Sequence, residues 1–249
     1  MSGPQCAHNP PTLDPASGAG HVQQLGGLNT YVTGDQDSKL AVILLADAFG
    51  WEVPKLRNLA DKVAASGFLV VVPDFYYGDQ FTREKAGPGW VETHPPDRGC
   101  EDAKNIIAAL KSKGVSKIGA AGFCWEKLSP TISIQVMEAI VREWILGMVA
   151  VRLAKYECIE AAVVLHPGPI TVEEINEVKT PIAILGAEID HIAPPEMIKR
   201  LGDVDSFVKI FPGVGHGWTV RYNDDDEFAV KSALESHSDM LNWLTKYVK

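Results

Sequence analysis

A cysteine, an aspartate and a histidine each follow a short apolar segment of the sequence, at Cys124, Asp190 and His216. A free thiol has a pKa near ~8.5 and is mostly protonated at neutral pH, so a nucleophilic cysteine needs a neighbouring histidine or a helix N-terminus. An aspartate that fixes the tautomer of this histidine completes a nucleophilic triad. We expect Cys124 to attack the carbonyl of a small ester or lactone and form a thioester. Water activated by His216 then hydrolyses the thioester, and no metal or organic cofactor is expected.

The surroundings of Cys124 favour a nucleophile over a buried packing cysteine. The segment Gly122-Phe123-Cys124-Trp125 follows an expected strand and contains most of a nucleophile elbow, with cysteine in place of serine. The order nucleophile, acid, base is also the chain order of α/β-hydrolase triads. Taken singly, a loop aspartate or histidine is more often a turn former or a solvent-facing residue. Three such residues at the ends of expected strands favour the triad.

From Lys39 onward, short β-branched runs alternate with helical stretches. This alternation predicts a single α/β domain with a mostly parallel sheet covered by helices on both faces. Together with the chain order of the triad residues, it indicates a single-domain α/β-hydrolase fold. Ligands of such sheets bind at the carboxyl ends of the strands, where the three residues fall. The expected strands are Ala41–Leu45, Phe68–Val72, Lys117–Ala121, Ala161–Leu165, Ile182–Gly186 and Phe207–Phe211. The expected helices lie near Lys55–Ser66, Cys100–Lys113, within 130–156, near Pro195–Leu201 and near Phe228–Lys246, the last capped by the acidic run Asp224–Glu227.

The first 20 residues carry four prolines and three glycines without periodicity, which is typical of a flexible surface arm. The turn residues Gly26-Gly27 then predict a hairpin between Val22 and Tyr31. We therefore expect an N-terminal arm at residues 1–20 and one α/β domain at residues 21–249.

Composition and charge exclude several classes of function. The chain has 249 residues and a net charge of -9, which disfavours nucleic acid and anionic membrane surfaces as partners. The apolar runs are far shorter than the ~18 residues of a membrane span, and the N-terminal residues lack a targeting signal, so we expect a cytosolic protein. The four cysteines form no C-x-x-C pair, which indicates reduced thiols rather than disulfides or a zinc site. The expected partner is a small-molecule substrate, and the expected state is a monomer or a weak homodimer.

Several motifs together resemble the dienelactone hydrolase family, particularly its plant cytosolic members. They are Gly122-Phe123-Cys124-Trp125, the segment Leu-Gly-Ala-Glu-Ile-Asp-His at 185–191, Val-Gly-His-Gly-Trp at 214–218, Asp74-Phe75 and His166-Pro167-Gly168. The resemblance implies Cys124 as nucleophile, His216 as base and Asp190 as the orienting acid. It also implies an oxyanion hole from the backbone N–H groups of Ala48 and Trp125, and an interior acid near the thiol at Asp47, where bacterial members have glutamate.

The resemblance says less about the substrate. Bacterial members hold a substrate carboxylate with an arginine that is replaced here by Gly78, after Pro73-Asp74-Phe75-Tyr76-Tyr77. Arg221 is a candidate for this anion contact, although a solvated surface position is the alternative. Four aromatic residues are candidates for a hydrophobic substrate pocket, with simple core packing as the alternative: Phe75, Tyr76, Tyr77 and Trp218.

The family pattern breaks directly after the proposed nucleophile. A complete elbow continues with glycine into a helix, but here Glu126 follows Trp125. The residues expected for that helix in the family pattern begin again only at Gly147. Residues 126–146 therefore resemble an insertion. A side chain at position 126 strains a turn that needs glycine, and a later helix start moves the positive helix end away from the thiol.

Two further functions stay open beside the cysteine hydrolase. The insertion is interpreted either as a new apolar helix or as a splice or gene-model variant. In both cases it is compatible with a catalytically impaired family member that acts as a binding protein. Plant relatives sometimes carry a β-glucanase label, and Asp47 and Asp190 are the two carboxyl groups available for glycoside cleavage. That chemistry leaves Cys124 and His216 without a role.

Overall fold

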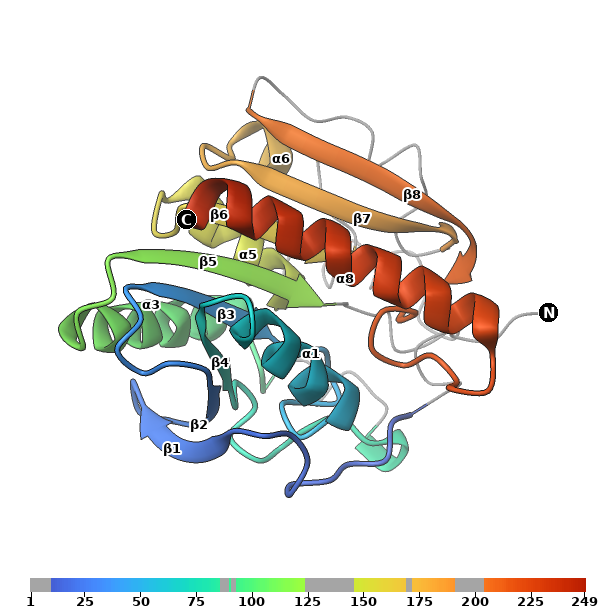
Figure 1. Cartoon of the computed structure of the whole chain (residues 1–249), viewed down its shortest axis with the longest axis horizontal. Coiled ribbons are helices and arrows are strands. Elements are labelled where there is room, and N and C mark those ends of the chain that lie inside the picture. The colour runs from blue at the N-terminus through green and yellow to red at the C-terminus, as the bar shows by residue number, and fades with distance from the viewer. Residues whose placement is uncertain (1–9, 86–89, 91–92, 124–145, 169–171, 191–203) are drawn as a thin grey trace.

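The computed structural model describes residues 10–85, 90, 93–123, 146–168, 172–190 and 204–249. Its strands form one sheet in the order β1-β2-β4-β3-β5-β6-β7-β8 (Figure 1). The hairpin β1–β2 is antiparallel to β4, and all pairings from β4 to β8 are parallel. The strands are β1 His21–Leu25, β2 Leu28–Thr33, β3 Leu40–Leu45, β4 Leu69–Pro73, β5 Lys117–Phe123, β6 Ala161–Leu165, β7 Ile182–Ile189 and β8 Ser206–Gly215.

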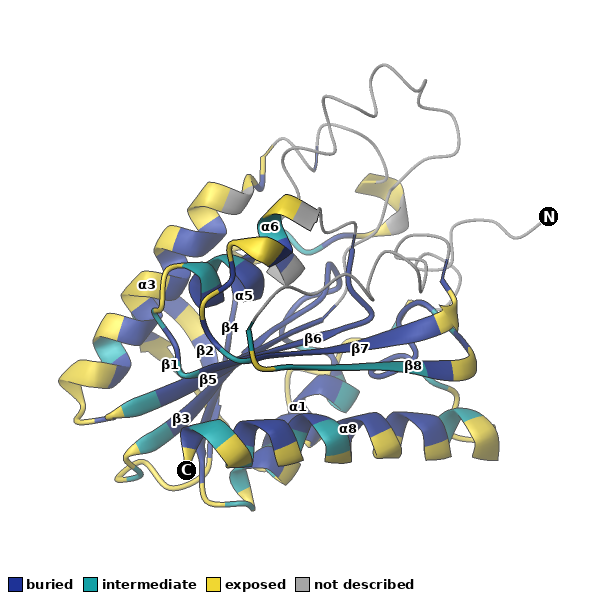
Figure 2. Cartoon of the chain, turned by 90° about the horizontal axis from the view of Figure 1, so that it is seen from above, coloured by how far each residue is buried: buried dark blue, intermediate teal, exposed yellow. Residues whose placement is uncertain are grey.

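Helices cover the sheet on both faces. Helices α1 and α8 pack on one face, and α3, α5 and α6 lie on the other (Figures 1 and 2). The helices are α1 Pro54–Ala64, α3 Pro96–Ser112, α5 Leu146–Lys155, α6 Val172–Asn176 and α8 Glu227–Val248, with a short 3₁₀ turn, η2, at Arg83–Lys85. The mostly parallel α/β sheet predicted from the sequence is thereby confirmed.

The central strands are buried along their whole length. Every residue of β4 and β6 is buried, as both strands are covered on both faces (Figure 2). Strands of this kind are near-continuous apolar runs without polar alternation, because neither face meets water. The core therefore lies along the middle of the sheet, and polar side chains are confined to strand ends and helix surfaces.

Each expected strand is present, and most differ from the prediction by only one or two residues at the ends. The turn at Gly26-Gly27 joins β1 and β2 as predicted. The acidic run caps the last helix, where a side-chain oxygen of Asp226 accepts a hydrogen bond of 3.0 Å from the Ala229 N–H. The helix expected near Pro195–Leu201 lies outside the described residues. Helix α6 was not predicted, because five residues are too few for a periodic pattern.

The described part of the N-terminal segment is bonded to α1. Arg57, whose side chain is almost fully buried, donates to the carbonyl oxygens of Pro15 (2.6 Å), Ser17 (3.3 Å) and Trp51 (3.1 Å). The Ala19 N–H donates to Asp61 at 2.8 Å. Burial lowers the pKa of Arg57 from its ordinary value. One buried cation thus holds together the segment before β1 and the turn before α1.

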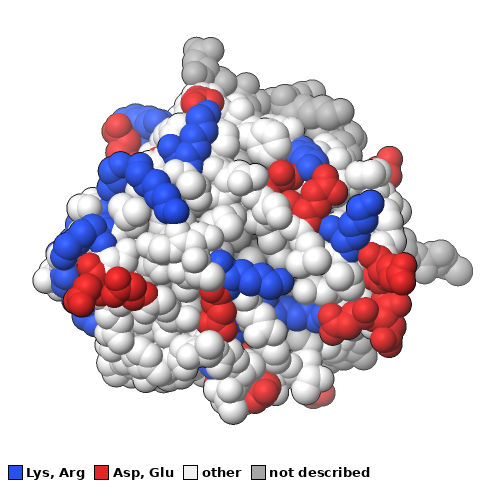
Figure 3. All heavy atoms as spheres, viewed as in Figure 1, with Lys and Arg blue, Asp and Glu red and all other residues white. Residues whose placement is uncertain are grey.

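The surface carries charges of both signs. On the face that carries α1 and α8, lysine and arginine side chains are interspersed with aspartate and glutamate (Figure 3). Among the described residues, no helix is both long enough and apolar enough to cross a bilayer.

Candidate active site

A break in strand register brings Asp190 and His216 together. Near the carboxyl end of the β7–β8 pair, Ala187 is level with Phe211, but Ile189 is level with Gly215. Strand β8 therefore has two extra residues between these points, which is a β-bulge. Without this shift, the residue after Ile189 would be level with Val214. With it, Asp190 and His216 are the next residues of two adjacent parallel strands, and a bulge beside a functional site is a common device for aiming a side chain.

The two side chains form a buried hydrogen-bonded pair. His216 Nδ1 lies 2.8 Å from Asp190 Oδ2, and neither side chain is accessible to solvent. A carboxylate only accepts hydrogen bonds, so the imidazole proton lies on Nδ1 and the lone pair on Nε2. A histidine oriented in this way is ready to take a proton from a nucleophile or from water. The structure thus brings together two of the three predicted catalytic residues.

Asp47 and Ala48 lie in the turn after β3. Asp47 Oδ1 accepts from the Phe49 N–H at 3.0 Å, and its carbonyl oxygen accepts from Gly50 at 2.9 Å. These two bonds fix the turn. Asp47 is buried there, and its Oδ2 lies 3.3 Å from Nε of Arg221. The predicted interior acid therefore forms an ion pair with the predicted anion-binding arginine.

Arg221 is not a solvated surface residue, so that alternative was wrong. Its side chain is only 3% exposed, and its guanidinium lies 5.2 Å from the centre of the Phe49 ring. The residue also lines an open cavity of about 520 Å³ beside Val53, Pro54 and Tyr222. The sequence offered no signal for this burial, because the loop after His216 turns back into the protein instead of leaving it.

The four aromatic candidates occupy different environments. Tyr76 is buried against Trp90 and His94, with ring centres 5.3 and 5.4 Å away. Trp218 packs on Phe211 at 4.4 Å, and Phe75 is buried. Tyr77 is 48% exposed and donates from its hydroxyl to Asp102 of α3 at 2.8 Å. Tyr76 and Trp218 thus pack in the core, which was the alternative to a substrate pocket. The side chain of Tyr77 contacts helix α3 and not the pair of His216 and Asp190.

Cys124, Trp125 and residues 126–145 lie outside the described residues. Strand β5 ends at Phe123, the residue that directly precedes Cys124, and α5 begins at Leu146, the last residue of the predicted insertion. Phe123 is paired with Leu165 of β6. The described chain therefore reaches to within one residue of the predicted nucleophile.

His166 joins this group, although the sequence suggested no role for it. It follows Leu165 at the end of β6 and is completely buried. Its ring centre lies 5.1 Å from that of His216, with the rings nearly perpendicular, and 6.2 Å from that of Phe123. The one available signal was its place directly after a buried strand, as for Asp190 and His216.

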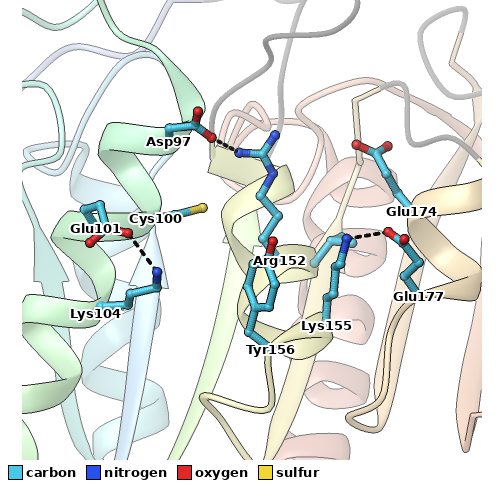
Figure 4. Close-up of a pocket in the computed structure, with 10 residues that line it drawn as sticks. Asp97, Cys100, Glu101, Lys104, Arg152, Lys155, Tyr156, Glu174 and Glu177 are labelled. Atoms are coloured by element: carbon cyan, nitrogen blue, oxygen red, sulfur yellow. Dashed lines mark hydrogen bonds and ion pairs between the residues drawn. The ribbon is translucent and has the colours of Figure 1, made fainter.

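A cavity of about 880 Å³ between α3, α5 and α6 is a separate feature (Figure 4). Its cationic side chains are paired with carboxylates, as in the Arg152–Asp97, Lys104–Glu101 and Lys155–Glu177 contacts. Burial raises the pKa of the Cys100 thiol, which keeps the thiol protonated and unreactive. This cavity is therefore not a candidate for the hydrolytic site. Within the described ranges, no cluster of three His, Cys, Asp or Glu residues is suited to a metal ion.

A model of the dienelactone hydrolase family matches residues 28–130 and 146–248. The unmatched residues 131–145 fall inside the range predicted as an insertion.

Curated relatives and solved structures are also similar to the chain. An endo-1,3;1,4-beta-D-glucanase of Zea mays is 38% identical over 202 residues, which are 79% of this chain and 60% of that relative. The chain thus spans less than two thirds of the maize protein. A carboxymethylenebutenolidase homolog of Mus musculus is 29% identical over 246 residues, 93% of this chain and 92% of that relative. The crystal structure of a dienelactone hydrolase-like promiscuous phosphotriesterase from metagenomic libraries has a TM-score of 0.67 at 17% identity, and covers 93% of this chain and 100% of that one.

Proposed function

The chain belongs to the dienelactone hydrolase family, and we propose that it hydrolyses a small carboxylic ester or lactone through a thioester acyl-enzyme. The observation that carries the proposal is the buried hydrogen bond between His216 and Asp190 at the carboxyl end of the sheet. A histidine held in this tautomer by a buried carboxylate is the base that acyl transfer requires.

Cys124 is the proposed nucleophile. Its role is supported by its position next to Phe123 and by the rings of His166 and His216, which follow one another from the end of β5 toward β8. His216 Nε2 takes the thiol proton, and the thiolate attacks the carbonyl carbon. The alcohol leaves with a proton from His216, and water activated by the same nitrogen then hydrolyses the thioester.

The tetrahedral intermediate carries a negative oxygen that needs fixed donors. We assign this role to the backbone N–H groups of Ala48 and Trp125. The support for Ala48 is its place in the turn after β3, which two hydrogen bonds to Asp47 hold in shape. Trp125, outside the described residues, is assigned from the sequence alone.

Arg221 is the proposed contact for an anionic substrate. Because Arg221 is already paired with the buried Asp47, a substrate carboxylate has to compete with Asp47 for the guanidinium. An acid released from this pair near the thiol is able to assist its deprotonation. The proposal therefore favours substrates that carry a carboxylate beside the scissile ester.

The test uses hydrolysis of an activated aryl ester and of a lactone that carries a carboxylate. Cys124→Ala is expected to abolish turnover while its thermal unfolding stays close to that of the parent. Iodoacetamide near neutral pH is expected to alkylate Cys124 ahead of the buried Cys100, which serves as the internal control. Undiminished turnover by Cys124→Ala contradicts the proposal.

A family member without activity is the competing possibility raised by residues 126–146. A variant that lacks these residues and carries a glycine after Trp125 separates the two. Equal turnover in both chains means that the insertion leaves the site intact. Turnover only in the shortened chain means that the insertion blocks the site, and slow alkylation of Cys124 in the full chain would accompany that result.

Glucan hydrolysis is a second candidate, favoured by the maize relative named as a β-glucanase. It requires two carboxyl groups on either side of one glycosidic bond. Asp47 and Asp190 are engaged with Arg221 and His216, which weakens this candidate. Reducing-sugar release from a mixed-linkage glucan by the Cys124→Ala variant would support it.

A reducing compartment such as the cytosol suits this chemistry, since the nucleophile is a thiol that oxidation inactivates. The free thiols of Cys100 and Cys158 are consistent with such a location. Fractionation of the source tissue with an antibody to the chain tests this part of the proposal.

A further inference from the structure

His166 is a buried histidine that the mechanism above does not use. It lies at the end of β6, and its ring is in edge-to-face contact with the ring of His216. Three features of this residue are unusual for one that only fills space: its backbone conformation, its buried nitrogen and the way in which Thr219 holds its ring.

The backbone of His166 has a φ of 40°, in the left-handed region. Residues with a side chain seldom adopt this conformation, and it concentrates at functional sites. The conformation carries an energetic penalty that packing alone does not explain, because many residues fill a buried volume without it. The strain therefore indicates that this particular side chain has to be directed to this particular place.

The two ring nitrogens of His166 differ in their contacts. Nδ1 lies 3.0 Å from the hydroxyl oxygen of Thr219, whereas Nε2 is buried and has no hydrogen-bond partner within the part of the chain that the structure describes. A buried nitrogen without a partner is destabilising. A partner that arrives with the substrate removes this penalty during the reaction.

Thr219 is itself held in place. It is completely buried, and its carbonyl oxygen lies 2.8 Å from Nε2 of His237 on α8. The pKa of His166 is far below its usual value, first because the ring is buried and then because His216 and Arg221 lie near it. His166 therefore stays neutral at physiological pH, with one nitrogen that donates and one that accepts.

We propose that His166 is a further catalytic residue of the hydrolase, which donates a hydrogen bond from Nε2–H to an oxygen of the bound ester or lactone. Ester and lactone groups offer only acceptor oxygens, so Nε2 has to carry the proton. The Thr219 hydroxyl then donates to Nδ1 and fixes that tautomer. This assignment rests on the proposed function for its substrate, but the tautomer is a property of the protein alone.

The kinetic test compares two replacements that share the strained backbone. His166→Phe keeps a ring against His216 and loses both nitrogens, whereas His166→Gln places an amide N–H near the position of Nε2. With an activated aryl ester, His166→Phe is expected to lower kcat/KM on the order of 100-fold, the usual effect of removing one donor to a reacting oxygen. His166→Gln is expected to recover at least a tenth of the parent value. Parent activity in His166→Phe, or no gain in His166→Gln, overturns the proposal.

Two further variants test the role of Thr219, and a third supplies a control. Thr219→Val removes the hydroxyl at nearly constant volume and is expected to lower kcat/KM, and Thr219→Ser is expected to restore it. His94→Gln is the matched control, because His94 is also a buried histidine, but its ring packs against Tyr76 and Trp90. It is expected to retain parent kcat/KM. Equal losses in His94→Gln and His166→Phe would mean a structural effect and would overturn the proposal.

Nitrogen NMR of histidine-labelled protein separates this proposal from the proposed function. His166 is expected to be neutral with its proton on Nε2 from about pH 5 to about pH 8, where an ordinary histidine titrates. A proton on Nδ1 overturns the proposal even if the chain is a cysteine hydrolase. If the parent protein hydrolyses neither ester nor lactone but His166 carries its proton on Nε2, the proposed function is contradicted and the tautomer assignment stands.

Discussion

Nε of Arg221 lies 3.3 Å from Oδ2 of Asp47, and both side chains are almost entirely inaccessible to solvent. The two residues are 174 positions apart in the sequence (221 minus 47) and join the turn after β3 to the loop after β8. Removing one charge of such a buried pair is destabilising, because the opposite charge then stays desolvated without its ionic partner.

Breaking this ion pair is therefore expected to destabilise the fold. Arg221→Met and Asp47→Leu are each expected to lower the free energy of unfolding by about 3 to 5 kcal/mol. The double variant is expected to lose clearly less than the sum, because neither charge is left alone. Urea unfolding of the four proteins forms a double-mutant cycle, and strictly additive losses would contradict the coupling.

Asp190→Asn tests whether Asp190 orients His216, the proposed base. An amide in place of the carboxylate allows the wrong imidazole tautomer, and kcat is expected to fall about 10³- to 10⁴-fold. The control is Asp205→Asn, which changes an exposed carboxylate just before β8. Ester hydrolysis under saturating substrate is the measurement, and similar kcat values for the two variants would show that Asp190 has no special role.

The bulge in β8 is expected to be necessary for activity. Gly213 lies in the bulge with a φ of 69°, and an added Cβ would come within 3.1 Å of the Phe228 ring. Gly27→Ala is the matched control, since Gly27 also has a positive φ but open space around it. Both variants are expected to lose about 1 to 2 kcal/mol of stability from the left-handed backbone, but only Gly213→Ala is expected to lower kcat. A parent kcat in Gly213→Ala, or equal reductions of kcat in both variants, would contradict the role of the bulge.

The buried histidines are expected to make the protein less stable in acid. Burial lowers the pKa of His237 to about 4, so the unfolded chain binds a proton at a higher pH than the folded one. Above about pH 6.5, His237 is neutral in both states and does not change the free energy of unfolding. As the pH falls from there toward 4, only the unfolded chain gains the proton, and the free energy of unfolding drops by about 2 kcal/mol between pH 7 and pH 5. His166 acts in the same direction. Denaturant unfolding of His237→Gln over this pH range is expected to show a smaller loss than the parent, and an unchanged loss would refute the assignment.

Arg57 is expected to stabilise the segment before β1. Arg57→Ala removes three hydrogen bonds from a buried cation to backbone carbonyl groups, and a loss of about 3 kcal/mol is expected. Lys62→Ala on the exposed side of α1 is the control and is expected to change little. Hydrogen exchange of residues 14–20 is expected to accelerate in Arg57→Ala only. Exchange that is equally slow in both variants would mean that other contacts hold the segment.

Much of the fold was accessible from the sequence because the buried strands are short apolar runs with clear boundaries. Runs such as Ala161–Leu165 have no polar alternation, so their burial on both faces and their parallel pairing follow from composition. The family resemblance rested on motifs at strand ends and was confirmed by the family match. The five-residue helix α6 escaped prediction because it is too short for its apolar residues to show a helical period.

The candidate site was predictable in part. The sequence placed Asp190 and His216 after two expected parallel strands, at the carboxyl edge of the sheet. The pairing of these strands and the register shift that aligns the two residues depend on the path of residues 212–214 in three dimensions. The burial of Arg221 and the contact of His166 with His216 likewise depend on how distant loops fold back. The roles of Cys124, Trp125 and the insertion stay predictions.

The positions of Asp190 and His216 in the chain have a consequence for biosynthesis. Strands β3 to β6, which form the centre of the sheet, are complete by residue 165, whereas the proposed base, His216, follows β8, and its neighbour Thr219 is bonded to α8. A chain emerging from the ribosome therefore carries Cys124 long before the histidine that is proposed to activate it. Under the proposed mechanism, newly made molecules acquire hydrolytic competence only when β8 and α8 have been released and packed.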